Sequence, residues 1–259
     1  MRIIAGPCQH ETLEQSIAIA ETCARVCGKY SIEYYFKASY DKANRTSANG
    51  ERGQGLYSTL FDFREMKKEI PGLKILTDVH DERQIYTIRD EFEDDVDVLQ
   101  IPAFLCRQTD LIKAACTTGK IVNIKKGQFL APWDVKGILS KTNGANEVWI
   151  TERGTSFGYN TLVVDFTGLQ YMLDNYDVPI VLDATHAVQK PGGQGDSSGG
   201  NRDYVPGITR AGSALGITSF FMEVHANPDL APSDGANMLR LEDFERVVDD
   251  IVAINRVLK

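Results

Sequence analysis

The fold is indicated first by residues 96–126, VDVLQIPAFLCRQTDLIKAACTTGKIVNIKK, where two short apolar runs enclose a longer stretch. The runs at 96–102 and 120–126 are rich in β-branched residues, which favour strands. Between them, residues 109–119 show the apolar spacing of an amphipathic helix. A strand, a helix and a strand in this order predict a parallel β-α-β unit with a right-handed crossover.

The same alternation continues in both directions along the chain. Eight runs have strand character: RIIA (2–5), IEYYFKA (32–38), LKILTDV (73–79), VDVLQIP (96–102), KIVNIKK (120–126), EVWITE (147–152), VPIVLDA (178–184) and ITSFFMEV (217–224). Amphipathic stretches such as 56–70 and 241–259 lie between and after them. Eight units in 259 residues match the size of one (β/α)8 TIM barrel. We therefore expect an α/β fold with a single barrel domain over residues 1–259, and an open doubly wound sheet is the alternative.

The composition limits the kinds of partner that the chain can bind. Its 28 Lys and Arg residues and 36 Asp and Glu residues give a net charge of −8. Nucleic acids and anionic membranes bind basic surfaces, so we expect neither as a partner. The chain contains no apolar run of about 18 residues, and its N-terminus lacks the apolar stretch of a signal peptide. A cytoplasmic protein with small-molecule substrates is expected.

The cysteines are odd in number, and a chain of this size does not need disulfides to stabilise its core. We expect reduced thiols at Cys8, Cys23, Cys27, Cys106 and Cys116. Cys23 and Cys27 are four residues apart in a helix-like stretch, so they share one apolar face. This spacing indicates core packing rather than a metal site.

Polar side chains gather at the ends of seven of the eight expected strands. They are Lys37 and Ser39, Asp78 and His80, Gln100, Lys125 and Lys126, Glu152 and Arg153, Asp183 and His186, and Glu223 and His225. Barrel enzymes build their active sites at the C-terminal ends of the strands. The Gly/Ser-rich segment 189–207 follows the seventh strand and is expected to form a long loop on the same face, able to close over a substrate.

A cationic subset of the chain's polar residues, at three strand ends and in one loop, predicts a site for anionic substrates. It comprises Lys37, Lys42, Arg45, Lys125 and Arg153. Arg offers a planar fork and Lys a point charge, so the mixture suits phosphate and carboxylate groups. The alternative is solvated surface charge, which we expect for Lys126.

A second subset could hold a divalent cation. It comprises Cys8, His186, Glu223 and Asp234, which follow or end the first, seventh and eighth strands. These strands are neighbours in a closed barrel, and a thiolate, an imidazole and two carboxylates suit zinc, iron, cobalt or manganese. The alternative is that Cys8 is an ordinary buried thiol and His186 a hydrogen-bond donor.

Segments along nearly the whole chain resemble the 3-deoxy-D-manno-octulosonate 8-phosphate synthase family. They are KASYDKANRTS (37–47), TDVH (77–80), QIPAFLCRQTDL (100–111), IKKGQF (124–129), ERGTSFGYNTLVVD (152–165), DATHAVQ (183–189) and MEVHANPDLAPSDG (222–235). The resemblance implies condensation of phosphoenolpyruvate with D-arabinose 5-phosphate and water. The related heptulosonate 7-phosphate synthase, which uses erythrose 4-phosphate and has a KPR-type segment in place of KANRTS, is one alternative. A catalytically silent phosphosugar-binding barrel is the other.

The resemblance also implies roles for individual residues. It places phosphoenolpyruvate on Lys37, Ser39, Lys42, Gln100, Ala103, Lys125, Arg153 and His186. It places arabinose 5-phosphate on Asn44, Arg45 and Thr46, with a neighbouring subunit of a homotetramer helping to hold the sugar phosphate. We expect Lys125 and Arg153 to neutralise the departing phosphate, and the candidates for proton transfer are Lys42, Asp78 and His186.

Members of this family divide into metal-dependent and metal-independent classes, with Cys at the deciding position in the first and Asn in the second. GPCQHE (6–11) supplies Cys8 at this position. The resemblance therefore implies the metal-dependent class, with Cys8, His186, Glu223 and Asp234 as ligands.

Overall fold

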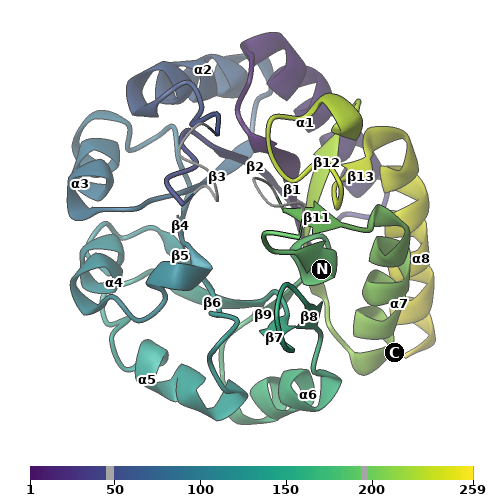
Figure 1. The fold of residues 1–259 in the computed structure, drawn as a ribbon. Helices are drawn as coiled ribbons and strands as arrows, with labels where there is room; N and C mark the ends of the chain where they lie inside the picture. Colours follow the sequence, from purple (N-terminus) through teal and green to yellow (C-terminus); the bar gives the residue numbers. More distant parts are fainter. Residues whose placement is uncertain (45–49, 194–197, 259) are drawn as a thin grey trace.

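A computed structural model describes residues 1–44, 50–193 and 198–258, and its central feature is a closed barrel of parallel strands (Figure 1). The strands follow one another around the ring as β1 (Arg2–Gln9), β2 (Glu33–Ser39), β3 (Lys74–Asp78), β4 (Val98–Ile101), β5 (Ile121–Lys125), β6 (Glu147–Glu152), β9 (Ile180–Asp183) and β12 (Ser219–His225). Pairing of β1 with β12 closes the ring, with Ile3 opposite Phe220. This closure confirms the (β/α)8 barrel and excludes the open sheet.

Helices cover the outside of the ring (Figure 1). They are α1 (Leu13–Gly28), α2 (Leu56–Glu69), α3 (Glu82–Glu91), α4 (Thr109–Cys116), α5 (Val135–Leu139), α6 (Phe166–Asn175), α7 (Val205–Leu215) and α8 (Phe244–Val257). Local sequence signals set several of their ends. Asp81 and Gln84 form a reciprocal capping box at the start of α3, and Gly216 ends α7 with a left-handed φ of 101°.

Short strands and 3-10 helices lie in the loops that connect the barrel strands with the helices. The strands are β7 (Thr155–Ser156), β8 (Leu162–Val163), β10 (Gln189–Lys190), β11 (Gly199–Gly200) and β13 (Leu239–Arg240). The 3-10 helices are η1 (Ala103–Leu105), η2 (Pro132–Asp134), η3 (His186–Val188), η4 (Arg202–Tyr204), η5 (Pro228–Leu230) and η6 (Leu241–Asp243). Within the described ranges, every helix is too short or too polar to cross a membrane.

Side-chain alternation along the strands separates a barrel floor from a polar mouth. Ile4, Tyr35, Leu76, Val98, Trp149, Val181 and Phe221 form one buried apolar cluster. Successive side chains of a strand point to opposite faces, so a residue two positions later points to the same side. Tyr35 thus shares its side with Lys37, and Phe221 shares its side with Glu223. Because the apolar residues at one end of the barrel point inward, the polar residues two positions later on the same strands also point inward, at the other end.

The larger core lies between the strands and the helices. Cys23 and Cys27 of α1 belong to it and are fully buried, which confirms their predicted packing role. All five cysteines are free thiols, as the sequence predicts. Burial raises the pKa of the Cys27 thiol to about 12.

Candidate active site

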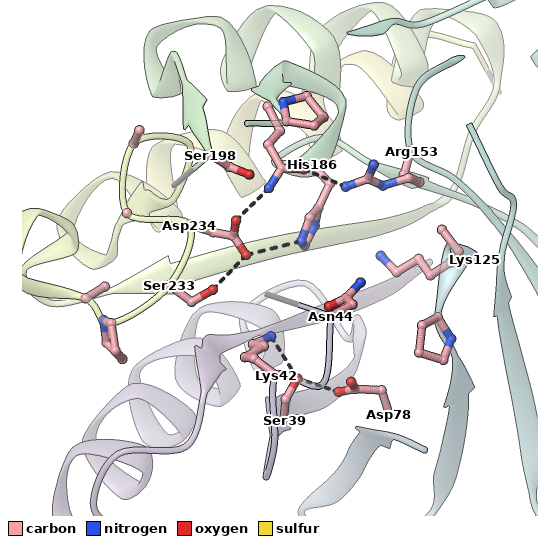
Figure 2. Close-up of a pocket in the computed structure, with 18 of the residues that line it drawn as sticks. Ser39, Lys42, Asn44, Asp78, Lys125, Arg153, His186, Ser198, Ser233 and Asp234 are labelled. Atoms are coloured by element: carbon pink, nitrogen blue, oxygen red, sulfur yellow. Dashed lines mark hydrogen bonds and ion pairs between the residues drawn. The ribbon is translucent and has the colours of Figure 1, made fainter. Parts of the chain in front are cut away.

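A cavity of about 590 Å³ opens at the C-terminal ends of the strands (Figure 2). Its lining includes the predicted site residues Lys37, Ser39, Lys42, Asn44, Asp78, Gln100, Ala103, Lys125, Arg153, His186 and Asp234. Cys8 and Glu223 are fully buried and contact lining residues. Arg45 and Thr46 lie outside the described residues. The structure thus brings all the other predicted site residues to one end of the barrel.

Three side chains from neighbouring parts of the barrel could hold a metal ion. The ligand atoms of Cys8, His186 and Glu223 all lie within 4.8 Å of one another. Asp234 Oδ2 accepts a hydrogen bond from Cys8 Sγ over 3.2 Å and lies 3.8 Å from His186 Nε2. Glu223 Oε2 is buried, and no described residue offers it a hydrogen bond. A buried carboxylate oxygen is costly without a partner, so this donor set fits a divalent cation.

The backbone is unusual at two of these residues. Cys8 has a φ of 64° and Asp234 a φ of 56°, a left-handed conformation that is uncommon for residues other than glycine. In β1, the pairing with β2 shifts between Ala5 and Cys8, which is a β-bulge. Bulges redirect side chains and are frequent beside active sites. Here the bulge brings the thiol of Cys8 to the carboxylate of Asp234.

Lys37 joins the metal-ligand group to the rest of the cavity. Its Nζ lies 3.1 Å from Glu223 Oε1 and donates hydrogen bonds to the Cys8 carbonyl oxygen over 2.9 Å and to Ser39 Oγ over 3.1 Å. Burial opposes the charge, but Glu223 and the other nearby acids outweigh it and raise the pKa of Lys37 above its usual value. Lys37 is therefore a charged group on the cavity floor.

Ser39 connects Lys42 with Asp78, as Figure 2 shows. Lys42 Nζ donates to Ser39 Oγ over 2.9 Å, and Ser39 Oγ donates to Asp78 Oδ1. Asp78 Oδ2 is 2.9 Å from His80 Nε2. Burial alone would raise the pKa of Asp78, but the hydrogen bond from His80 and the charge of Lys37 hold it well below its usual value. Asp78 thus remains a carboxylate that orients its neighbours.

Asp183 lies between the predicted phosphate-binding and metal-binding groups. Its Oδ2 forms an ion pair with Lys125 Nζ and lies 2.8 Å from His186 Nδ1. Burial disfavours the imidazolium of His186, but Asp183 reverses the balance and raises the pKa of His186 to about 10. For Lys125, burial outweighs the attraction of Asp183 and lowers the pKa to about 8. The ammonium of Lys125 also lies 3.2 Å from the centre of the Phe221 ring, a cation–π contact.

Arg153 has one half of its guanidinium fixed, and the other half has no partner among the residues that the structure describes. Its Nη2 donates to Gln189 Oε1 over 2.8 Å. Its Nη1 is buried, and none of the described residues accepts a hydrogen bond from it. Burial lowers the pKa of Arg153, and Asp183 and Asp234 oppose that effect. A buried guanidinium with an unused donor, on the wall of a cavity, is suited to an anion.

The expectation of a solvated surface charge at Lys126 is wrong. This side chain is fully buried, and its Nζ lies 3.1 Å from Glu152 Oε2. Alternation along β5 directs Lys125 into the barrel and the next residue outward, where helices cover the strand and bury any charge. The acidic partner comes from the neighbouring strand β6, which the local sequence could not reveal.

Sequence reasoning also missed two residues of the site. Gln189 contacts both Arg153 and Asp234, although it appeared only as part of a quoted segment. Arg202 lines the cavity and donates to Asp229 Oδ1 over 2.5 Å. Both lie in the loop after β9, where no strand pattern predicts the direction of a side chain. The expectation that the loop after β9 lies on this face is supported at its described residues, because Gln189, Pro191, Ser198 and Arg202 line the cavity.

Comparison with known proteins agrees with this geometry. The DAHP synthetase I family model matches residues 1–255. The 2-dehydro-3-deoxyphosphooctonate aldolase of Nitrobacter hamburgensis is 50% identical over 261 residues, covering 100% of this chain and 89% of the relative. The proteins of the same name from Bradyrhizobium diazoefficiens and Caulobacter vibrioides are each 48% identical, covering 99% and 100% of this chain and 90% and 89% of the relatives. That name is a synonym of 3-deoxy-D-manno-octulosonate 8-phosphate synthase, so the resemblance is confirmed. The chain belongs to the DAHP synthetase I family.

Proposed function

We propose that this protein condenses phosphoenolpyruvate with D-arabinose 5-phosphate and water, giving 3-deoxy-D-manno-octulosonate 8-phosphate and inorganic phosphate. The observation that carries the proposal is the cavity itself. One cavity of about 590 Å³ places Lys42, Lys125 and Arg153 beside His186 and Asp234. Two anionic substrates require several separate cations, and the net charge of −8 makes this local concentration notable. The names of the full-length relatives support the same reaction.

The reaction forms one carbon–carbon bond and one carbon–oxygen bond, the latter to the oxygen of water, and breaks the carbon–oxygen bond that links phosphoenolpyruvate to its phosphate. Carbon 3 of phosphoenolpyruvate attacks the aldehyde carbon of the sugar, whose oxygen takes up a proton. The oxygen of water adds to carbon 2 and gives up both its protons, which balance the proton gained by the sugar oxygen and a proton that leaves with phosphate as the bond from carbon 2 to the phosphate oxygen breaks. Holding two substrates and water in line accounts for a large part of such a rate enhancement.

The cationic residues would bind and neutralise the substrate anions. Lys125 and Arg153 lie on the cavity wall and would hold the phosphate that departs. Arg153 Nη1, which donates to none of the described residues, would be one donor. Binding of that anion would offset the burial that lowers the pKa of Lys125. Lys37, Ser39, Gln100 and Ala103 would complete the phosphoenolpyruvate site, and Asn44, Arg45 and Thr46 would hold the sugar phosphate. Lys42, Asp78 and His186 are our candidates for proton transfer.

We further propose that Cys8, His186, Glu223 and Asp234 hold a divalent cation such as zinc, iron, cobalt or manganese. The mixed sulfur, nitrogen and oxygen donors support this assignment, and so does Glu223 Oε2, which accepts no hydrogen bond within the described part of the chain. A cation there would act as a Lewis acid on the aldehyde oxygen or on the water. Asp183 would orient His186 through Nδ1 and leave Nε2 for the cation.

The domain organisation, the location and the oligomeric state of the protein are also proposals. The barrel elements extend from Arg2 to Val257, which supports a single catalytic domain over residues 1–259. We propose a cytoplasmic homotetramer on the strength of the family resemblance, and the five free thiols agree with a reducing compartment. Sedimentation velocity would test the tetramer, and a monomer at working concentration would contradict it.

The test is release of inorganic phosphate from phosphoenolpyruvate with arabinose 5-phosphate and, separately, with erythrose 4-phosphate. Each assay is run on protein as purified, after chelator treatment and after metal is restored. We expect turnover with the five-carbon sugar, lost with chelator and regained with metal. Chelator-resistant turnover would remove the metal proposal and keep the reaction. Preference for erythrose 4-phosphate would restore the heptulosonate alternative, and tight binding of both substrates without turnover would indicate a silent barrel.

A further inference from the structure

Gln189 connects two groups that the proposed function treats separately. Arg153 Nη2 donates to Gln189 Oε1 over 2.8 Å, and Gln189 Nε2 donates to Asp234 Oδ1 over 2.6 Å. Figure 2 shows Arg153 and Asp234 on opposite sides of His186. We propose that Gln189 is a positioning residue that orients Arg153 for the substrate anion and Asp234 for the metal ion. This inference rests on the proposed function.

The amide is the chemical group that this bridge requires. A guanidinium has only donors and a carboxylate has only acceptors, so the side chain between them must accept on one side and donate on the other. The side chain of Gln189 does both, and its two partners fix which end of the amide faces which group. An apolar side chain of the same length would leave both neighbours free to rotate.

The bridge also occupies the atoms that the ligands do not need. At Arg153 it holds Nη2, and the buried Nη1 remains without a partner among the described residues. At Asp234 it holds Oδ1, while Oδ2 is the oxygen 3.2 Å from Cys8 Sγ and 3.8 Å from His186 Nε2. Each partner therefore keeps one atom directed to its own ligand.

The main chain of Gln189 is held in place independently of its side chain. Gln189 lies opposite Gly200 in the antiparallel β10–β11 pair, and the following residue, Lys190, lies opposite Gly199. The side chain is partly exposed, so its replacement should not open a cavity in the core. A change at Gln189 should thus act on its two partners rather than on folding.

The test uses Gln189→Met, with Gln189→Asn as a second variant whose amide is one methylene too short to span both partners. The dissociation constant of phosphoenolpyruvate is measured by calorimetry, and that of Co²⁺ by the absorbance of its bond to a thiolate. We expect both constants to rise in each variant, by roughly 10-fold, as for other residues that orient metal ligands. Gln170→Met, the same change on exposed α6, should leave both constants unaltered, and thermal midpoints check folding.

Double-mutant cycles separate positioning from general disturbance. The effect of Gln189→Met on phosphoenolpyruvate should vanish in an Arg153→Lys background, and its effect on Co²⁺ should vanish in an Asp234→Asn background. Fully additive effects, or constants within twofold of the wild type in both variants, would overturn the inference. So would a wild-type protein that binds neither probe. Binding requires no turnover, so a protein that binds both probes but releases no phosphate would defeat the proposed reaction and leave this inference standing.

Discussion

At the scale of single residues, the site works by pairing each buried charge with an opposite one while leaving selected atoms free. Asp183 forms ion pairs with Lys125 and His186, and Glu223 forms an ion pair with Lys37. Unpaired burial of any of these charges would be costly. Arg153 Nη1 and Glu223 Oε2 are buried and have no hydrogen-bond partner among the described residues, and we expect each of them to contact a ligand.

Replacement of Cys8 by Ala should weaken metal binding. The thiol is one of three ligand atoms within 4.8 Å of one another, and loss of a direct ligand should cost at least as much as loss of an outer partner, about 10–100-fold in affinity. Competition with a chromogenic chelator measures the change. Cys116→Ala in α4 removes a buried thiol that does not line the cavity and serves as the control. Equal affinities in the two variants would exclude Cys8 as a ligand.

Arg153→Lys should keep a positive charge and lose activity. A lysine cannot donate to Gln189 and present a second donor in the same plane. We expect kcat/KM for phosphoenolpyruvate to fall by about 10²–10³, the usual cost of one lost donor to developing charge. Steady-state kinetics test this, with Arg210→Lys on exposed α7 as the matched control. Unchanged kinetics would show that the planar fork is not used.

At the scale of elements, the bulge in β1 determines where Cys8 points, and Gly6 permits the bulge. A Cβ at Gly6 would overlap the carbonyl oxygen of Lys37 in β2. Gly6→Ala should therefore lower the thermal midpoint and also weaken metal binding, because β1 must move away from β2. Gly28→Ala at the end of α1 meets no atom within 4 Å and should be neutral or stabilising by up to about 1 kcal/mol. Calorimetric melting of both variants distinguishes the two positions, and equal midpoints would contradict the argument.

Helix α1 should contribute a pH dependence to stability through Cys27. The pKa of the Cys27 thiol is about 12 in the folded protein against an ordinary value of 9.0, so between these values the folded thiol keeps a proton that the unfolded thiol has lost. The contribution of Cys27 to the free energy of unfolding is therefore fully present below pH 9 and is lost as pH rises towards 12. In urea unfolding with reductant present, Cys27→Ala should show a smaller decline between pH 8 and pH 10 than the wild type. If the stability of the wild type and of the variant fell equally with pH, the raised pKa of Cys27 in the folded protein would not be the cause.

At the scale of the whole molecule, α8 packs against both α7 and α1, and so lies where the chain closes on itself. Ile251 of α8 is fully buried, whereas Val257 on the same helix is 85% exposed. Ile251→Ala should lower the free energy of unfolding by about 2–5 kcal/mol, and Val257→Ala should change it by less than about 0.5 kcal/mol. Urea titration measures both. The KM of Ile251→Ala for phosphoenolpyruvate should equal that of the wild type. A raised KM would mean that the packing of α8 also affects the geometry of the active site.

The alternation of apolar and polar residues was enough to predict eight strands that form a barrel. It also predicted that the active site lies at the C-terminal ends of these strands. These features depend on near neighbours in the sequence, through strand and helix periodicity. For the same reason, Lys37, Asp78, Gln100 and Lys125 could be placed in one cavity before any contact was known.

Only the tertiary structure decided which of these groups pair. Lys126 is buried against Glu152, Gln189 bridges Arg153 and Asp234, and Cys8 reaches Asp234 from a left-handed backbone. Each contact joins segments that are distant in the sequence or belong to a loop, where no periodicity directs the side chains. The sequence by itself determined the barrel and the chemical types at its mouth. Their pairing was decided by tertiary contacts between neighbouring strands and between strands and loops, because these bring together residues that no local pattern relates. Closure of β1 on β12 is one such contact, and it brings Cys8 to Asp234, 226 positions away.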